Sequence, residues 1–302
     1  MSFYELASSG GISLGAVLGP LFWASLHLWA FVVIALLDLS GAALVLLFVR
    51  EKKRPSDGGS SRRHFSLQRY RAIISHRNLL LFIPAWIAVN AILGIWLTSQ
   101  ITLVLAGHLH VRGQLFVGSL YRQESNLSAY LGGYVLLFSV CVVVWAFILG
   151  RLPRLPVLLF TLPGSAIACL GLVGMNHGGP LLVFLPVVIV GVFLEAGFTP
   201  AALAYLADQS RMFAEDRGFV MGLYSVILGI GYLLGNLLGG IFAQIAYFDG
   251  LALLTVLFVL IGMVSLGSLC IVQRKNQRSG THKARSPTRV HKTKDHGGRE
   301  SV

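Results

Sequence analysis

Two acidic residues, Glu195 and Asp38, lie inside long apolar stretches of the sequence. A charged side chain near the centre of a bilayer costs roughly 3 kcal/mol or more, so each acid needs a partner, a wet cavity or a proton. Burial favours the protonated form of a carboxyl group, which suits a residue that alternately binds a proton and a cation. At Glu195 we therefore expect either such an exchange site or a structural acid satisfied by neighbouring hydroxyl and backbone groups.

Other reactive residue types do not form a recognisable catalytic set, so we expect neither an enzyme nor a cofactor. His108 and His110 have a ligand-like spacing of two, but no third ligand lies near them in the sequence, and a metal site is not favoured. The three cysteines each sit inside an apolar run, where we expect packing rather than a disulfide or a zinc site; they are Cys141, Cys169 and Cys270.

Several polar side chains within apolar stretches could face a cavity or could join helices by hydrogen bonds. They are Asn90, Gln100, Tyr130 and Tyr134. Pro163 and Pro200 each free a backbone carbonyl within a helix and are typical of kinks. Pro200 follows Glu195 by five residues and is the favoured hinge.

The composition predicts that lipid surrounds the elements that carry these residues. Hydrophobic residues make up 55% of the chain and charged residues only 12%, whereas soluble domains contain about 25% charged residues. Eight stretches reach the roughly 20 apolar residues that a membrane-spanning helix needs. We thus expect an all-α, polytopic membrane protein with helices near residues 6–26, 28–49, 79–105, 127–150, 155–175, 180–206, 218–246 and 249–272.

Basic residues predict the orientation of these helices. With residues 50–77 on the cytoplasmic side, 22 of the 24 Lys and Arg residues lie on that side, and only Arg112 and Arg122 lie opposite. This asymmetry predicts cytoplasmic termini in a plasma or inner membrane, and explains the net charge of +12 without a nucleic acid partner. Residues 50–77 form either a solvated basic linker or, near residues 65–77, an amphipathic helix on lipid. Residues 273–302 are expected to be a disordered cytoplasmic tail.

An internal repeat relates the first predicted helix to the seventh by a shift of 220 residues. Glycines recur in register, and those of the seventh helix are expected to allow close helix packing rather than to cradle phosphate. The second copy comes six helices after the first, an even number, so both copies cross the membrane in the same direction. The matching residues are Met1, Tyr4, Gly11, Leu14, Gly15, Leu18, Gly19 and Phe22 with Met221, Tyr224, Gly231, Leu234, Gly235, Leu238, Gly239 and Phe242.

Parallel six-helix halves, together with three motifs, resemble the major facilitator superfamily. The run GAVLGP, with Gly15, Gly19 and Pro20, is similar to the Gly-Pro motif of the family's fifth helix, although Trp23 and Ala24 replace its closing glycine pair. The segments GFTPAALAYLAD (197–208) and RGFVMGLYS (217–225) are similar to the junction of the tenth and eleventh helices. The run GRLPR (150–154) takes the place of the cytoplasmic gating loop but lacks its acidic residue.

The resemblance implies an organisation that lacks the family's first four helices. Residues 1–49 would be the last two helices of the first half, residues 50–77 the linker, and residues 78–272 the complete second half. It places Glu195 on a cavity-lining helix and Asp38 on a peripheral one. Near the inner gate, a charged loop is expected to form either closing salt bridges or a solvated turn; its residues are Asp208, Glu215, Asp216 and Arg217. Arg151 and Arg154 belong to the run in the place of the gating loop, where the usual charge pairs are not expected because the acidic residue is missing.

The function implied by the resemblance is secondary active transport of a small solute across the bilayer, with proton-coupled efflux by antiport as the finer expectation. Glu195 is the favoured coupling residue. Two alternatives stay open from the sequence. The chain could be a truncated remnant that inserts without transporting, or a scaffold that recruits lipid or a partner through its basic loop and tail.

Overall fold

The computed structural model describes residues 11, 14, 15, 18, 19, 22, 25–48, 77–97, 99–107, 111–121, 124–211 and 217–284. Regular structure in these ranges is helical, apart from an isolated bridge between Val111 and Gln114. The helices are α2 (Trp29–Phe48), α4 (Arg77–Trp96), α5 (Ser99–Ala106), α6 (Glu124–Ile148), α7 (Arg154–Thr161), α8 (Gly164–Asn176), α9 (Leu181–Arg211) and α10 (Arg217–Ala284).

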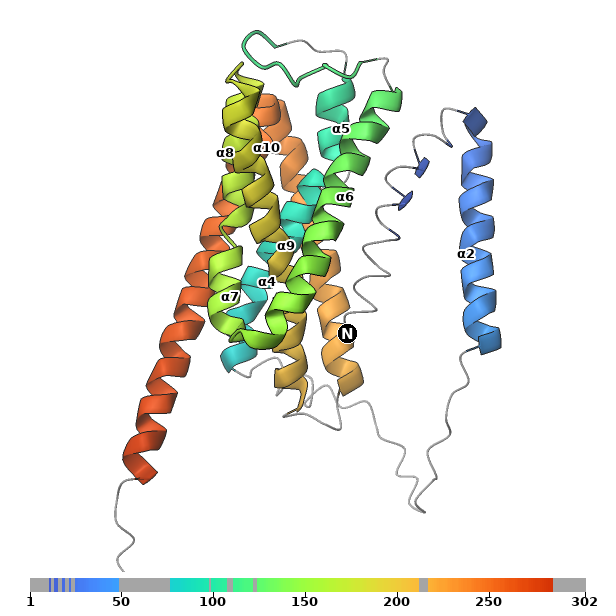
Figure 1. Cartoon of the computed structure of the whole chain (residues 1–302). Coiled ribbons are helices and arrows are strands. Elements are labelled where there is room, and N and C mark those ends of the chain that lie inside the picture. The colour runs from blue at the N-terminus through green and yellow to red at the C-terminus, as the bar shows by residue number, and fades with distance from the viewer. Residues whose placement is uncertain are drawn as a thin grey trace, which may run out of the picture.

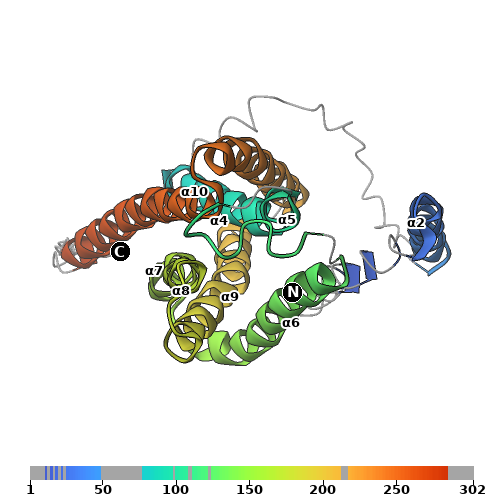
Figure 2. The ribbon, with the colours of Figure 1, turned by 90° about the horizontal axis from the view of Figure 1, so that it is seen from above.

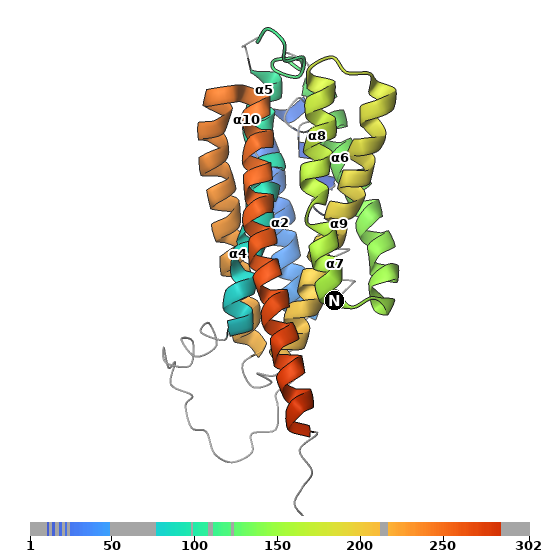
Figure 3. The ribbon, with the colours of Figure 1, turned by 90° about the vertical axis from the view of Figure 1, so that its left-hand side faces the viewer.

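Six stretches of the described chain are long and apolar enough to cross a membrane. The longest, within α10, contains two helices, because the backbone leaves helical geometry at Ala246 and Tyr247 and the chain turns back there (Figure 3). The seven helices predicted from residue 28 onward are therefore confirmed. The predicted helix 6–26 falls mostly outside the described residues, and those described between 11 and 22 are helical.

Proline explains one interruption of these spans. The predicted helix 155–175 divides into α7 and α8, and Pro163 lies at the break, directly before α8 begins, because its ring cannot donate the backbone hydrogen bond that a continuous helix requires. By contrast, α9 runs without a break through Pro186 and Pro200. The observed interruption thus lies at Pro163 and not at Pro200, the position that the sequence favoured as a hinge.

Helices α4 to α10 form one bundle, and α2 stands apart from it (Figures 1 and 2). Helix α4 packs closely against the first part of α10 through small residues. A side chain at Gly231 or Gly235 would collide with the α4 backbone around Ala91, and one at Gly94 would collide with Tyr232. The predicted close packing is confirmed at Gly231 and Gly235, whereas a side chain built at Gly222 or Gly229 meets no atom within 4 Å.

Large apolar side chains cover the outside of the described bundle and of α2. Leu182, Phe147 and Leu46 are among the most exposed, and none of the most apolar stretch of α2 is buried. A water-facing surface rarely carries contiguous apolar patches of this extent, whereas lipid is their natural solvent. The chain is therefore a multi-pass membrane protein.

The ends of the bundle agree with the predicted alternation of the connections. The α6–α7 connection, the end of α9 and the start of α10 lie together at the lower end in Figure 1. The segment after α5, the α8–α9 turn and the break in α10 lie at the opposite end. Helix α10 continues to Ala284, beyond the predicted helix end at residue 272, and the disordered tail stays a prediction. The basic linker, residues 50–76, lies outside the described residues.

Candidate functional site

A cavity of about 230 Å³ lies inside the bundle between α4, α6, α8 and α9. Most of its lining is aliphatic or aromatic, and Glu195 is the sole acidic residue among the described residues that line it. The lining residues are Trp96, Tyr130, Leu131, Gly133, Tyr134, Leu137, Ser165, Ala168, Cys169, Leu172, Met175, Leu185, Val188, Val192 and Glu195.

The carboxyl group of Glu195 is deeply buried, with only 5% of the residue's surface exposed. Its Oε2 atom accepts a hydrogen bond of 3.5 Å from the hydroxyl of Tyr134, and Ser165 lies beside the same group. Its Oε1 atom has no hydrogen-bond partner within the described structure. A buried carboxyl oxygen without a partner is costly, so this site is chemically incomplete without a proton or a cation.

Close contact between α8 and α9 places Ser165 beside Glu195. A side chain at Gly164 would meet the backbone nitrogen of Glu195, and one at Gly191 would meet the backbone of Ala168. Small residues at both contacts let the two helices approach at backbone distance. The cavity-lining residues of α8, including Ser165, therefore lie next to those of α9, including Glu195.

Helix α6 completes the cavity wall and is anchored to α9 by Trp145. The indole Nε1 of Trp145 donates a hydrogen bond of 2.7 Å to the carbonyl of Phe193, and the two rings stack at 5.5 Å. Gly197 leaves room for the same indole ring. Because α6 is fixed to α9 at this point, Tyr130 and Tyr134 face the cavity from the opposite wall.

Asp38, the second acid expected in an apolar stretch, does not contribute to this cavity. It lies on α2 and is exposed, and it is absent from the cavity lining. Of the motif near the N-terminus, Gly15 and Gly19 have no atom within 4 Å that would oppose a side chain, and Pro20 lies outside the described residues. The cavity therefore selects Glu195 from the two acids.

Two of the predicted gating residues meet at the lower end of the bundle. Arg154, at the start of α7, donates a hydrogen bond of 2.6 Å from Nη1 to Oδ2 of Asp208 on α9. Arg151 is exposed in the short turn before α7. Arg217 begins α10, but its side chain lies outside the described part. The sequence supplied Arg154 and Asp208 as candidates without pairing them.

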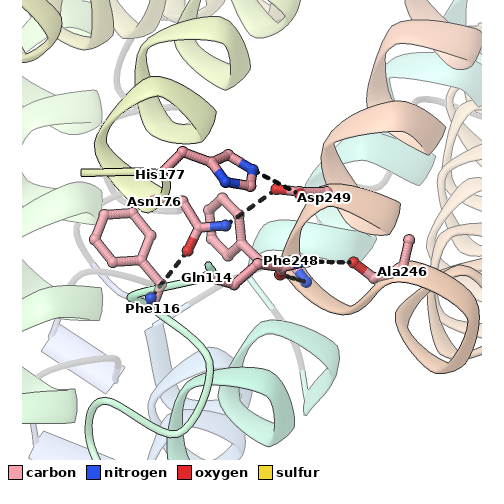
Figure 4. A network of polar contacts seen from close by, with 7 residues as sticks. All are labelled: Gln114, Phe116, Asn176, His177, Ala246, Phe248 and Asp249. Atoms are coloured by element: carbon pink, nitrogen blue, oxygen red, sulfur yellow. Dashed lines mark hydrogen bonds and ion pairs between the residues drawn. The ribbon is translucent and has the colours of Figure 1, made fainter. Parts of the chain in front are cut away.

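At the upper end, a polar network that the sequence analysis missed joins three connections (Figure 4). Asp249 accepts a hydrogen bond of 3.0 Å from Asn176 and one of 2.8 Å from His177 when the imidazole Nε2 is protonated. Asn176 also accepts a hydrogen bond of 2.9 Å from the backbone nitrogen of Phe116. The side-chain amide of Gln114 bridges Ala246 and Phe248.

An aromatic contact leads from this network to the cavity. Phe248 packs edge-on against both Phe116, at 5.1 Å, and Trp96, at 5.6 Å. Trp96 lines the cavity and donates a hydrogen bond of 2.9 Å from Nε1 to Thr255. A signal for these residues was present in the sequence, because Asn176, His177 and Asp249 are polar residues at the predicted ends of apolar helices.

Tyr130 and Tyr134 were predicted to face a cavity or to join helices, and both line the cavity. Asn90 instead donates a hydrogen bond of 2.7 Å to the carbonyl of Trp86 in its own helix. Among the described residues, no group of three or more His, Cys, Asp or Glu side chains could hold a metal ion. His108 and His110 lie outside the described residues.

Comparison with known proteins places this architecture in a family. The family model of the Major Facilitator Superfamily matches residues 1–210 and, in an overlapping second match, residues 117–296. The tetracycline resistance protein, class H, of Pasteurella multocida is 31% identical over 129 residues. That segment covers 41% of this chain and 32% of the relative's length. Because the two family matches together extend over most of the sequence, the chain belongs to the major facilitator superfamily.

Proposed function

We propose that this protein carries out secondary active transport of a small solute, with proton-coupled antiport out of the cell as its mode and Glu195 as the coupling residue. The observation that carries the proposal is the buried Glu195 carboxyl group, whose Oε1 atom lacks a partner in an apolar cavity. The protein would act in the plasma or inner membrane with both termini in the cytoplasm.

Family membership supports transport as the activity. The relative is named a resistance protein, and outward transport is one way in which a membrane protein confers resistance to a solute. A carboxyl group that binds a proton and a cationic solute in turn can couple the exit of that solute to the entry of protons. The matched segment covers 32% of that relative's length, so the match does not indicate which solute this chain would transport.

The coupling step follows from the chemistry of one carboxyl group. When Glu195 holds a proton it is neutral and stable in its apolar surroundings, and when it loses the proton to water its charge requires a cation as partner. Proton and solute thus compete for the same oxygen atoms. One proton enters as one solute leaves, and neither step breaks a covalent bond other than the O–H bond.

The test is transport by the full chain in vesicles with an imposed proton gradient. Glu195→Gln keeps the size and the hydrogen bonding of the side chain but cannot lose a proton, so gradient-driven transport should fall to background. Asp38→Asn is the matched control, because it removes the same charge from an apolar helix outside the cavity, and it should retain transport. Unchanged gradient dependence in Glu195→Gln would remove the assignment. Absence of transport by the unaltered chain would favour the remnant alternative.

A further inference from the structure

We infer that the cavity beside Glu195 binds a compact organic monocation with an apolar body, such as an arylalkylammonium ion. The inference rests on the proposed transport function, because it names the class of solute that the same site would carry. Three properties of the cavity lead to it: the charge of its lining, the chemistry of its walls and its volume.

Charge selects the class of the solute. The described lining contains one acidic side chain and no basic one. The Oε1 atom of Glu195 is buried and unpaired, so a cationic group would supply the partner that the protein lacks. An anion would meet a carboxylate without any compensating basic residue, and a neutral solute would leave the ionised oxygen unpaired.

The walls select the rest of the molecule. Aliphatic side chains from α6, α8 and α9 surround Glu195, including Leu137, Leu172 and Val192. They offer apolar contact and no hydrogen bonds, which favours a hydrocarbon body. Tyr130 and Tyr134 add two aromatic rings to the cavity lining, and such rings attract a desolvated cation through their electron-rich faces.

The volume limits the size of the solute. At about 230 Å³, the cavity lies below the range of roughly 300–1,000 Å³ that is typical of sites for drug-sized ligands. A dry apolar cavity of about 150 Å³ binds benzene, so this space accepts a solute built on a single substituted ring. Benzylammonium, benzyl alcohol and benzoate have this size and differ in charge.

The experiment measures binding of these three probes to the full chain in detergent at neutral pH by isothermal titration calorimetry. Benzylammonium should bind at least tenfold more tightly than benzyl alcohol and benzoate. Glu195→Gln should weaken benzylammonium binding at least tenfold and leave benzyl alcohol within twofold. Glu195→Asp retains the carboxyl group and should keep the order of the three probes.

A second variant separates the cavity from the charge. Gly133 lines the cavity, and a side chain built there meets no atom within 4 Å. Gly133 is also exposed, so Gly133→Leu should add a bulky side chain at the edge of the cavity without displacing the backbone, and should weaken the binding of benzylammonium and benzyl alcohol alike by at least tenfold. An unchanged thermal unfolding midpoint shows that the variant is folded.

The inference is overturned if benzyl alcohol or benzoate binds as tightly as benzylammonium. It is equally overturned if Glu195→Gln leaves the affinity for benzylammonium unchanged, or if Gly133→Leu has no effect. Its failure is distinguishable from failure of the proposed function. If Glu195→Gln abolishes proton-coupled transport but the cavity shows no preference for benzylammonium, only the proposed solute class is wrong. If the chain binds benzylammonium selectively but does not transport in vesicles, the proposed transport function is wrong and the cation site remains.

Discussion

Glu195 owes its chemical character to its neighbours. An acid near the middle of a long apolar helix could equally well be neutralised by surrounding donors, and Tyr134 and Ser165 approach only one side of the carboxyl group. The other oxygen is left facing a cavity without a partner. Asp38, an acid in a comparable apolar setting, is exposed on α2. Only Glu195 lines the cavity, and this difference between the two acids is the reason why we propose Glu195 as the coupling residue.

The ion pair between Arg154 and Asp208 gives a prediction at the same scale. Both side chains are well exposed, at 42% and 36%, so Asp208→Asn should lower the free energy of unfolding by at most about 1 kcal/mol. Thermal unfolding in detergent measures this change.

If the pair acts as a unit at the inner gate, Arg154→Gln and Asp208→Asn should alter the transport rate in vesicles by the same factor, and the double variant should alter it no further. Additive effects on the rate would show that the two residues act separately.

Among the elements, α7 and α8 follow each other along one span, and polar contacts join both ends of that span to other helices. At its upper end, Asn176 and His177 reach Asp249 of α10, and the backbone of Leu115 and Phe116 reaches Asn176. At the lower end, Arg154 of α7 reaches Asp208 of α9. Between these ends, Gly164 and Gly191 bring α8 and α9 into backbone contact. The cavity wall formed by α8 and α9 is therefore a well-connected part of the bundle.

The network at the upper end predicts that replacing Asn176 or His177 by alanine lowers the free energy of unfolding by different amounts. Asn176 is fully buried, so Asn176→Ala would leave the Phe116 backbone donor and one Asp249 oxygen without their partner, at a cost of about 1–3 kcal/mol. His177→Ala should cost less than about 1 kcal/mol, because His177 is 48% exposed and water can replace its contact with Asp249. Thermal unfolding midpoints in detergent give the order. A larger loss for His177→Ala would contradict the argument that the buried contacts of Asn176 stabilise the fold more than the exposed contact of His177.

For the whole molecule, the alternation of spans predicts on which side of the membrane each connection lies. Leu115 is exposed in the connection after α5, and Arg151 is exposed in the turn before α7, at the opposite end of the bundle (Figure 1). A membrane-impermeant maleimide added to intact cells should label Leu115→Cys and should label Arg151→Cys only after the membrane is opened. The unaltered chain is the control, since Cys141 and Cys169 are buried and Cys270 is half-buried. Labelling of both variants from outside would contradict the predicted topology.

The sequence by itself determined the class of protein and most of its helices. Hydrophobicity is a local property, because a bilayer forces each apolar stretch of about 20 residues to satisfy its own backbone hydrogen bonds as a helix. The helices after residue 28 could thus be located without tertiary information, and Glu195 could be singled out because an acid in such a stretch is costly. The motifs also sufficed to indicate the superfamily. The division of the chain into parts of two transporter halves stays a prediction.

The tertiary structure alone decided which of these residues meet. Rotation of a helix about its axis leaves its hydrophobicity unchanged, so the sequence could not tell which face of α9 turns toward α6 and α8. Contacts at Gly164, Gly191 and Trp145 fix that rotation. The same contacts decide which α9 residues, Glu195 among them, line the cavity. The pairing of Arg154 with Asp208 and of Asn176 with Asp249 joins residues 54 and 73 positions apart. Such pairs depend on how helix ends align across the bundle, a relation that local hydrophobicity does not encode.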